Sequence, residues 1–152
     1  MTDYETLCEE ARGLIGGIPH LISNLANLSA LLYRSLDEVN WAGFYLMEGE
    51  RLVLGPFQGK PACIEIPIGR GVCGTAVLTG STQRVEDVHA FPGHIACDAA
   101  SRSELVVPIR KDGRVVAVLD LDSAQPARFT PDDARGMEQL VRVIESELHD
   151  LF

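Results

Sequence analysis

The sequence predicts an α+β fold in which a central, mostly antiparallel sheet of about six strands packs against helices from both ends of the chain. Apolar residues recur every three or four positions near both termini, β-favouring runs fill the region between, and turn-forming residues join neighbouring runs. The 152 residues suffice for one hydrophobic core and are too few for two. We therefore expect one domain over residues 1–152.

The N-terminal region, from Asp3 to about Leu36, has the leucine and isoleucine spacing of helices that pack on one face. Helix-breaking residues interrupt the pattern at Gly13, Gly16, Gly17 and Pro19. Two helices are predicted before the sheet.

The region that follows contains short runs rich in β-branched and aromatic residues. A β-hairpin is predicted first, with strands at 41–47 and 52–54 around a turn at 48–50. A short helix is expected at 72–78, where glycines flank an apolar run. The other short strands of this region are expected at 63–68 and 83–85.

The clearest strand pair joins residues 104–110 to residues 115–122. The connection is Lys111-Asp112-Gly113, and Asp-Gly favours a tight turn between antiparallel strands. A final helix should begin after Thr130, which is a typical N-cap and precedes Pro131. Its apolar stripe continues almost to the C-terminus.

Composition excludes several function classes. The net charge of -9 and the absence of a basic cluster argue against nucleic acid as a partner. No apolar run approaches the roughly 20 residues that span a bilayer, so no membrane partner is expected. The acidic start, Met1 to Glu5, does not resemble an export signal. We therefore expect a cytoplasmic protein, whose four cysteines are core residues, metal ligands or reactive thiols.

Three cysteines stand in contexts that could support chemistry. Cys73 lies at the start of the short helix, where backbone N–H groups can lower a thiol pKa; the alternative is a small residue buried at a tight turn. Cys97 lies in a long connection near His94, and loops often contain functional residues. Cys63 precedes a strand and would by itself be interpreted as a core thiol.

The acids at the ends of the clearest strand pair form a second group. Asp120 and Asp122 are two apart on one strand, so they project to one side of the sheet, and Glu104 opens the neighbouring strand. They could be exposed edge carboxylates. Alternatively, they line a pocket that binds an ammonium group and supplies a proton to a substrate oxygen.

A zinc site is an alternative use of the thiols, because three cysteines and His94 would satisfy the coordination number of zinc. No closely spaced Cys-x-x-Cys pair is present to begin such a site. We expect neither a metal nor another cofactor.

Five segments together resemble the free methionine-(R)-sulfoxide reductases, which have the GAF-domain fold. These segments are Asn40-Trp41-Ala42-Gly43-Phe44-Tyr45, Leu54-Gly55-Pro56-Phe57-Gln58-Gly59, Gly69-Arg70-Gly71-Val72-Cys73-Gly74, Gly93-His94-Ile95-Ala96-Cys97-Asp98 and Leu119-Asp120-Leu121-Asp122-Ser123. The resemblance implies a single GAF-like domain that reduces free methionine sulfoxide. Cys8 lies outside this pattern and is interpreted as a core or surface thiol.

The resemblance also implies roles for the thiols. Cys97 would attack the sulfoxide and become a sulfenic acid, Cys63 would resolve it as a disulfide, and Cys73 would be a further thiol of the relay. The same positions would also support attack by Cys73 first. Thioredoxin or a similar dithiol would reopen the disulfide.

For the substrate, the resemblance implies that Trp41 and Tyr45 surround the S-methyl group. Glu104, Asp120 and Asp122 would meet the sulfoxide oxygen and the ammonium group. A closed acidic pocket of this kind would reject the same side chain inside a protein, where the ammonium is an amide. Family members are commonly dimers, and a homodimer is expected here.

A different class of function is a GAF module that senses a small ligand without catalysis. Such sensors are normally joined to an output domain, whereas this sequence ends at Phe152. The reductase is therefore the favoured hypothesis, with the sensor as its alternative.

Overall fold

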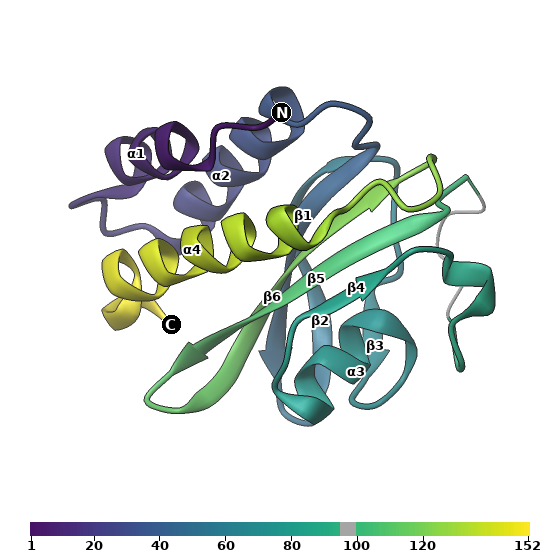
Figure 1. Cartoon of the computed structure of the whole chain (residues 1–152). Coiled ribbons are helices and arrows are strands. Elements are labelled where there is room, and N and C mark those ends of the chain that lie inside the picture. The colour runs from purple at the N-terminus through teal and green to yellow at the C-terminus, as the bar shows by residue number, and fades with distance from the viewer. Residues whose placement is uncertain (95–99) are drawn as a thin grey trace.

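The computed structural model describes residues 1–94 and 100–152, which form a six-stranded sheet with helices on both faces (Figure 1). The strand order is β3-β2-β1-β6-β5-β4, and every neighbouring pair is antiparallel. The strands are β1 (Trp41–Glu48), β2 (Arg51–Gly59), β3 (Glu65–Pro67), β4 (Gln83–Val85), β5 (Ser103–Lys111) and β6 (Arg114–Ser123). The predicted α+β class with an antiparallel sheet is confirmed.

The helices divide between the two faces of the sheet. In Figure 1, α1, α2 and α4 lie together on one side and α3 lies on the other, beside β3 and β4. They are α1 (Tyr4–Ile15), α2 (Leu21–Ser35), α3 (Gly71–Thr79) and α4 (Pro131–Glu147), with short 3₁₀ helices η1 (Val88–Ala90) and η2 (His149–Leu151). No helix among the described residues has both the length and the apolar character needed to cross a bilayer.

Most predicted elements are confirmed, but several differ in their limits. The second strand of the hairpin, expected at 52–54, is much longer and runs over Arg51–Gly59. Gly13 was expected to interrupt the helical pattern but lies inside α1, because one exposed glycine costs a helix only about 1 kcal/mol. The strand expected at 63–68 is shorter, since only Glu65–Pro67 pairs with β2. The last helix ends at Glu147, and the chain continues as η2.

Alternation along the strands divides the core into two clusters. Phe44 of β1 and Leu119 of β6 belong to the larger cluster, which packs against α1, α2 and α4. Tyr45 follows Phe44 on β1, and Val118 precedes Leu119 on β6. Both therefore point to the other face of the sheet and belong to the smaller cluster under α3. The smaller cluster therefore lies on the sheet face that also carries the polar residues described below.

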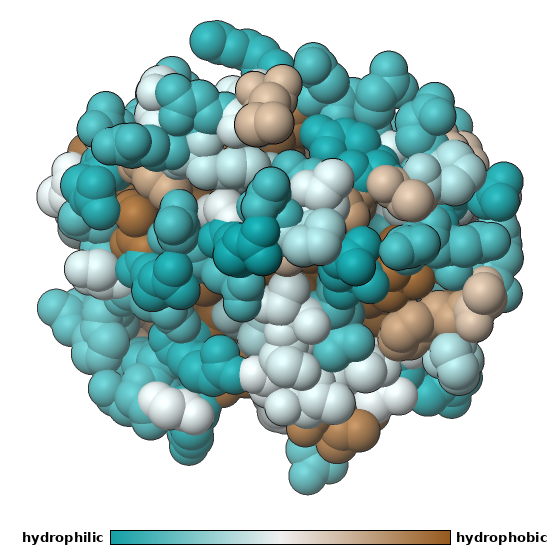
Figure 2. Space-filling view, in the orientation of Figure 1, coloured by the Kyte–Doolittle hydropathy of each residue, from teal (hydrophilic) through white to brown (hydrophobic). Residues whose placement is uncertain are grey.

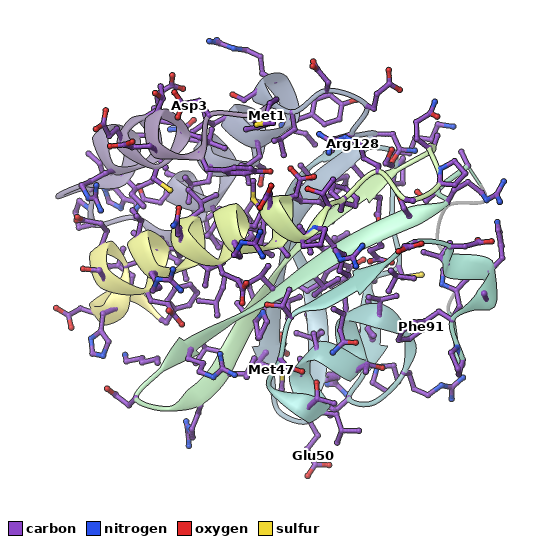
Figure 3. The ribbon with its side chains drawn as sticks, in the orientation of Figure 1. Met1, Asp3, Met47, Glu50, Phe91 and Arg128 are labelled. Carbon is purple, nitrogen blue, oxygen red and sulfur yellow. The ribbon has the colours of Figure 1, made fainter. Side chains whose placement is uncertain are left out.

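The start of α4 is fixed by a network of hydrogen bonds. Thr130 caps the helix by accepting from the N–H of Asp133 at 3.1 Å, while Asp133 accepts from the N–H of Thr130 at 2.8 Å, as in a capping box. Tyr4 of α1 donates a hydrogen bond to Asp133, and Arg128, labelled in Figure 3, pairs with it at 3.1 Å. The predicted N-cap is confirmed, and the network ties α1 to α4.

The surface offers no large apolar area on the face drawn in Figure 2. Hydrophilic residues cover most of that face, and hydrophobic residues emerge as separate small areas. Four of the large apolar side chains that are exposed, Leu14, Ile18, Ile22 and Tyr33, belong to α1, α2 and the connection between these helices.

Candidate active site

Strand register brings three carboxyl groups together under α3. Glu104 of β5 pairs with Asp122 of β6, and Asp120 pairs with Val106 two residues further along β5. Because residues two apart share a face of a strand, all three acids point to the side that α3 covers. All three line one pocket, in which Glu104 is 9% exposed and Asp120 is 5% exposed.

Trp41 and Tyr45 of β1 form an aromatic wall of the same pocket. Their rings stack with centroids 6.0 Å apart. Each ring is also tethered, because the indole N–H of Trp41 donates to the carbonyl of Lys60 at 3.1 Å and the hydroxyl of Tyr45 donates to the carbonyl of Cys63 at 2.9 Å. The wall therefore holds the connection between β2 and β3, which contains Cys63, against the pocket.

Gly43 lies on β1 between Trp41 and Tyr45, the two residues of the aromatic wall. It pairs with Asp120 across β1 and β6, and on the other side of β1 it lies against Phe57 of β2. A side chain there would collide with β2, since an added Cβ would lie 2.7 Å from Cα of Phe57. Phe57 in turn stacks on Trp41 with ring centroids 5.1 Å apart. Only glycine allows both contacts.

Cys73 covers the pocket from α3, in the first turn of the helix. Its side chain is 3% exposed, and its Sγ lies 3.9 Å from Oε2 of Glu104. The expectation that the helix N-terminus lowers the pKa of this thiol is wrong. Burial, followed by the negative charges of Asp120 and Glu104, raises the pKa of Cys73 well above its ordinary value. The partial charge of the helix is too small to offset these two effects.

Two of the three carboxyl groups, Glu104 and Asp120, have raised pKa values. Burial, and then the charges of Asp120 and Asp122, raise the pKa of Glu104 well above its ordinary value. Burial also raises the pKa of Asp120, although hydrogen bonds from Glu104 and Cys73 oppose this. Glu104 therefore holds a proton that it can donate. Oδ1 of Asp120 is buried and finds no hydrogen-bond partner among the described residues, so it can accept a hydrogen bond from a bound cation.

The other cysteines differ in their surroundings. Cys63 is half-buried and disulfide-bonded, whereas Cys8 and Cys73 are free thiols. Cys97, which the sequence singles out as the attacking thiol, lies outside the described residues. Cys8 belongs to the larger core cluster on the opposite face of the sheet, as expected for a core thiol.

One group of side chains in this pocket could hold a metal ion. Ligand atoms of Cys73, Glu104 and Asp120 lie within 4.8 Å of one another. Two carboxylates and a thiolate are ligands that zinc accepts. These three possible ligands differ from the zinc ligands that the sequence offered, because they include neither His94 nor Cys63. The same three groups are already joined to one another by hydrogen bonds.

Several further pocket residues were not singled out as site residues. They are Arg70, Ser101 and His94, of which His94 has a sequence signal, its place three residues before Cys97. Arg70 stands among the glycines that precede α3, and a cation in such a loop was an available signal. Ser101, two positions before β5, has no sequence signal, because only the fold brings it to this pocket.

Comparison with known proteins identifies the fold family. Residues 24–149 match the family described as GAF domain. This chain belongs to the GAF domain family. Its sheet, with α3 over one face and the remaining α-helices over the other, is thus a GAF-domain sheet, as the resemblance implied.

Similar proteins within the family include enzymes. The free methionine-R-sulfoxide reductase of Escherichia coli is 54% identical over 95% of this chain and 88% of its own length. The structure of fRMsr of Staphylococcus aureus in complex with substrate is 53% identical, with a TM-score of 0.93 over 97% of both chains. The free methionine-R-sulfoxide reductase of Neisseria meningitidis in complex with its substrate is 42% identical, with a TM-score of 0.91 over 95% of this GAF domain and 87% of that chain. These relatives confirm the resemblance drawn from the five segments.

Proposed function

We propose that this GAF domain reduces free L-methionine (R)-S-oxide to L-methionine, using its own thiols and a dithiol such as thioredoxin as the final reductant. The observation that supports this most strongly is the pocket itself. It combines a buried proton donor, an unpaired carboxylate oxygen, an aromatic wall and a thiol in a chain that is 54% identical to the Escherichia coli reductase.

The first step uses Cys97 as nucleophile. Its sulfur takes the oxygen of the sulfoxide, so methionine leaves as the thioether and the cysteine becomes a sulfenic acid. Glu104 donates a hydrogen bond to the sulfoxide oxygen, because its raised pKa keeps it protonated beside the other acids. Cys73 suits this step poorly, since burial and neighbouring carboxylates raise its pKa and reduce the thiolate fraction. This argues against the alternative in which Cys73 attacks first.

The second step resolves the sulfenic acid. The thiol of Cys63 condenses with it, so a disulfide forms and water leaves. The assignment is supported by the disulfide-bonded state of Cys63, in contrast to the free thiol of Cys73. Thioredoxin or a similar dithiol then reduces this disulfide by exchange and is itself oxidised. Cys73 acts as a further thiol of the relay.

The pocket has an aromatic part and an acidic part, which bind different groups of the substrate. Trp41 and Tyr45 contact the S-methyl group, while Asp120 and Asp122 bind the ammonium group. An isolated methionine sulfoxide has a charged ammonium, whereas the same residue in a protein has a neutral amide that cannot form an ion pair with these carboxylates. The pocket therefore selects the free amino acid.

We also propose that the protein is cytoplasmic and forms a homodimer. Light scattering after size-exclusion chromatography tests the dimer.

The proposal is tested by measuring methionine formed from each sulfoxide isomer, in separate assays with dithiothreitol and with thioredoxin as reductant. Cys97→Ser is expected to form no methionine even in a single turnover, whereas Cys63→Ser should form one equivalent and then stall with thioredoxin. Glu104→Gln should lower kcat by about 100-fold or more, the usual effect of removing a general acid. Cys8→Ser is the matched control, since Cys8 lies in the other core cluster, and should retain activity.

Two outcomes would contradict this function. If the wild-type protein forms no methionine from either isomer, the catalytic proposal fails, and the alternative of a ligand-sensing GAF module is favoured instead. If Cys97→Ser remains active and Cys73→Ser is inactive in one turnover, the order of the thiols is reversed.

A further inference from the structure

The connection between β2 and β3 contributes both to the pocket and to the thiol chemistry. Pro61 and Ala62 line the pocket, and Cys63 follows them directly in the chain. Between Gly59, where β2 ends, and Glu65, where β3 begins, the connection has no helix or strand of its own. Its position therefore depends on hydrogen bonds to the neighbouring sheet.

Two side chains of β1 hold this connection on either side of the residues that line the pocket. The indole N–H of Trp41 donates to the carbonyl of Lys60 at 3.1 Å, and the hydroxyl of Tyr45 donates to the carbonyl of Cys63 at 2.9 Å. Trp41 and Tyr45 are only 3% and 2% exposed. Because β1 lies inside the sheet, between β2 and β6, both side chains are firm anchors for an otherwise irregular segment.

The hydroxyl of Tyr45 is committed to this contact. A phenol has one hydrogen to donate, and here the carbonyl of Cys63 receives it. Burial, followed by the negative charge of Asp120, raises the pKa of Tyr45 above its ordinary value, so the hydroxyl keeps that hydrogen. The ring of Tyr45 lines the pocket, but its hydroxyl serves the chain around Cys63.

The contact is present while Cys63 is disulfide-bonded. It therefore favours the backbone geometry that the disulfide requires. On the other side of Cys63, the N–H of Leu54 donates to the carbonyl of Ile64 at 2.8 Å, although Ile64 itself is 69% exposed. Restricting a reacting group in this way raises the rate at which it meets its partner.

We propose that Tyr45 is a positioning residue for the second step of the reaction, because its hydroxyl holds Cys63 where the thiol can condense with the sulfenic acid. This inference rests on the proposed function, which assigns that step to Cys63. In the step an S–S bond forms, the S–O bond of the sulfenic acid breaks, and the oxygen leaves as water with the thiol proton. The ring of Tyr45 thus serves the first step and its hydroxyl the second.

The variant Tyr45→Phe tests this division, because it keeps the ring and removes the hydroxyl. Reduced protein, freed of reductant, is mixed with one equivalent of free L-methionine (R)-sulfoxide and quenched at intervals. Methionine formed reports the first step, and loss of the Cys63 thiol, measured by alkylation and mass spectrometry, reports the second. We expect disulfide formation to slow by about 5- to 10-fold and methionine formation to slow much less. Sulfenic acid on Cys97, trapped with dimedone, should accumulate.

Tyr4→Phe is the matched control. It also removes a tyrosine hydroxyl that donates a hydrogen bond, but the acceptor is Asp133, in the network between α1 and α4. This variant should lower the melting temperature and leave the ratio of the two rates unchanged. It therefore separates a loss of stability from a loss of positioning.

A second measurement needs no sulfoxide. The equilibrium between the Cys63 disulfide and dithiothreitol reports how strongly the fold favours the disulfide. In Tyr45→Phe this equilibrium should shift towards the reduced protein by about 5- to 10-fold, because the hydrogen bond that favours the disulfide geometry is lost. Tyr4→Phe should leave it unchanged.

The two measurements separate this inference from the proposed function. If the wild-type protein forms methionine and Tyr45→Phe slows both steps by the same factor, or slows neither, the positioning role is overturned while the function stands. If the wild-type protein forms no methionine, the proposed function fails and the equilibrium decides. A disulfide that is easier to reduce in Tyr45→Phe alone supports the contact with Cys63, whereas equal equilibrium constants in all three proteins overturn it.

Discussion

The Sγ of Cys73 lies 3.9 Å from Oε2 of Glu104, although one residue belongs to a helix and the other to a strand. The contact joins a thiol and a carboxyl group that are both buried. Burial raises the pKa of each, and the charge of Glu104 raises the pKa of Cys73 further. The pocket therefore keeps its protons on Glu104 and Cys73. This property has consequences that can be measured without substrate.

Cys73 should react slowly with iodoacetamide in the folded protein, because only the thiolate is nucleophilic and its pKa is raised. Asp120→Asn removes one of the negative charges that raise this pKa, so alkylation of Cys73 at pH 8 should become faster. Mass spectrometry of the Cys73 peptide against time measures the rate. Cys8 is the internal reference, because burial and not a neighbouring carboxylate raises its pKa. Wild-type Cys73 reacting as fast as glutathione would show that the pKa is not raised.

Glu104 should make the free energy of unfolding depend on pH. Its folded pKa is raised above the ordinary value of 4.5, so below pH 4.5 both states hold the proton and its contribution is fully present. As pH rises towards the folded pKa, the unfolded state loses its proton first and stability falls. Glu104→Gln removes this loss, and its stability relative to wild type should therefore increase with pH, by about 1–3 kcal/mol at neutral pH.

Urea denaturation at pH 5 and pH 8 measures this difference. Glu50→Gln is the matched control, because Glu50 is exposed at the turn between β1 and β2, away from the pocket (Figure 3). If the two variants show the same change between the two pH values, Glu104 is not protonated in the folded protein.

Gly43 should be intolerant of a side chain, whereas Gly13 should accept one. In Gly43→Ala the new Cβ would lie 2.7 Å from Cα of Phe57 and 2.8 Å from the carbonyl oxygen of Pro56, and backbone atoms cannot move away cheaply. We expect a loss of about 1–3 kcal/mol of unfolding free energy. Gly13→Ala meets nothing within 4 Å on α1 and should gain about 0.5–1 kcal/mol. Equal effects of the two substitutions would contradict the close packing of β1 on β2.

Asp133 should stabilise the protein at neutral pH and lose this effect in acid. Although burial raises its pKa, hydrogen bonds from Thr130 and Tyr4 and the charge of Arg128 outweigh burial, and the pKa lies below 3.8. Its contribution is present above pH 3.8 and is lost as pH falls through the folded pKa. Asp133→Asn should cost about 1–2 kcal/mol at pH 7 and less at pH 3. Thermal melts of Asp132→Asn, at the exposed neighbouring position, provide the comparison.

The sequence by itself determined most of the secondary structure, because the signals are local. Thr130 is the N-cap of α4, where it forms a capping box with Asp133, and the tight turn after Lys111 joins β5 to β6. The shared face of Asp120 and Asp122 follows from the two-residue period of a strand alone. The five segments also identified the family, because they combine three cysteines with these acids.

Tertiary structure decided what those residues are chemically. A local pattern predicted a lowered pKa for Cys73. The fold instead buries that thiol against Glu104 of β5, which only pairing between distant strands brings beneath α3. In the same way, nothing near Ser101 in the sequence indicates that its hydroxyl would be buried in a pocket that Arg70 also lines. Burial and charge depend on residues far apart in the chain, so the sequence determined which groups are present, and packing determined which of them hold a proton.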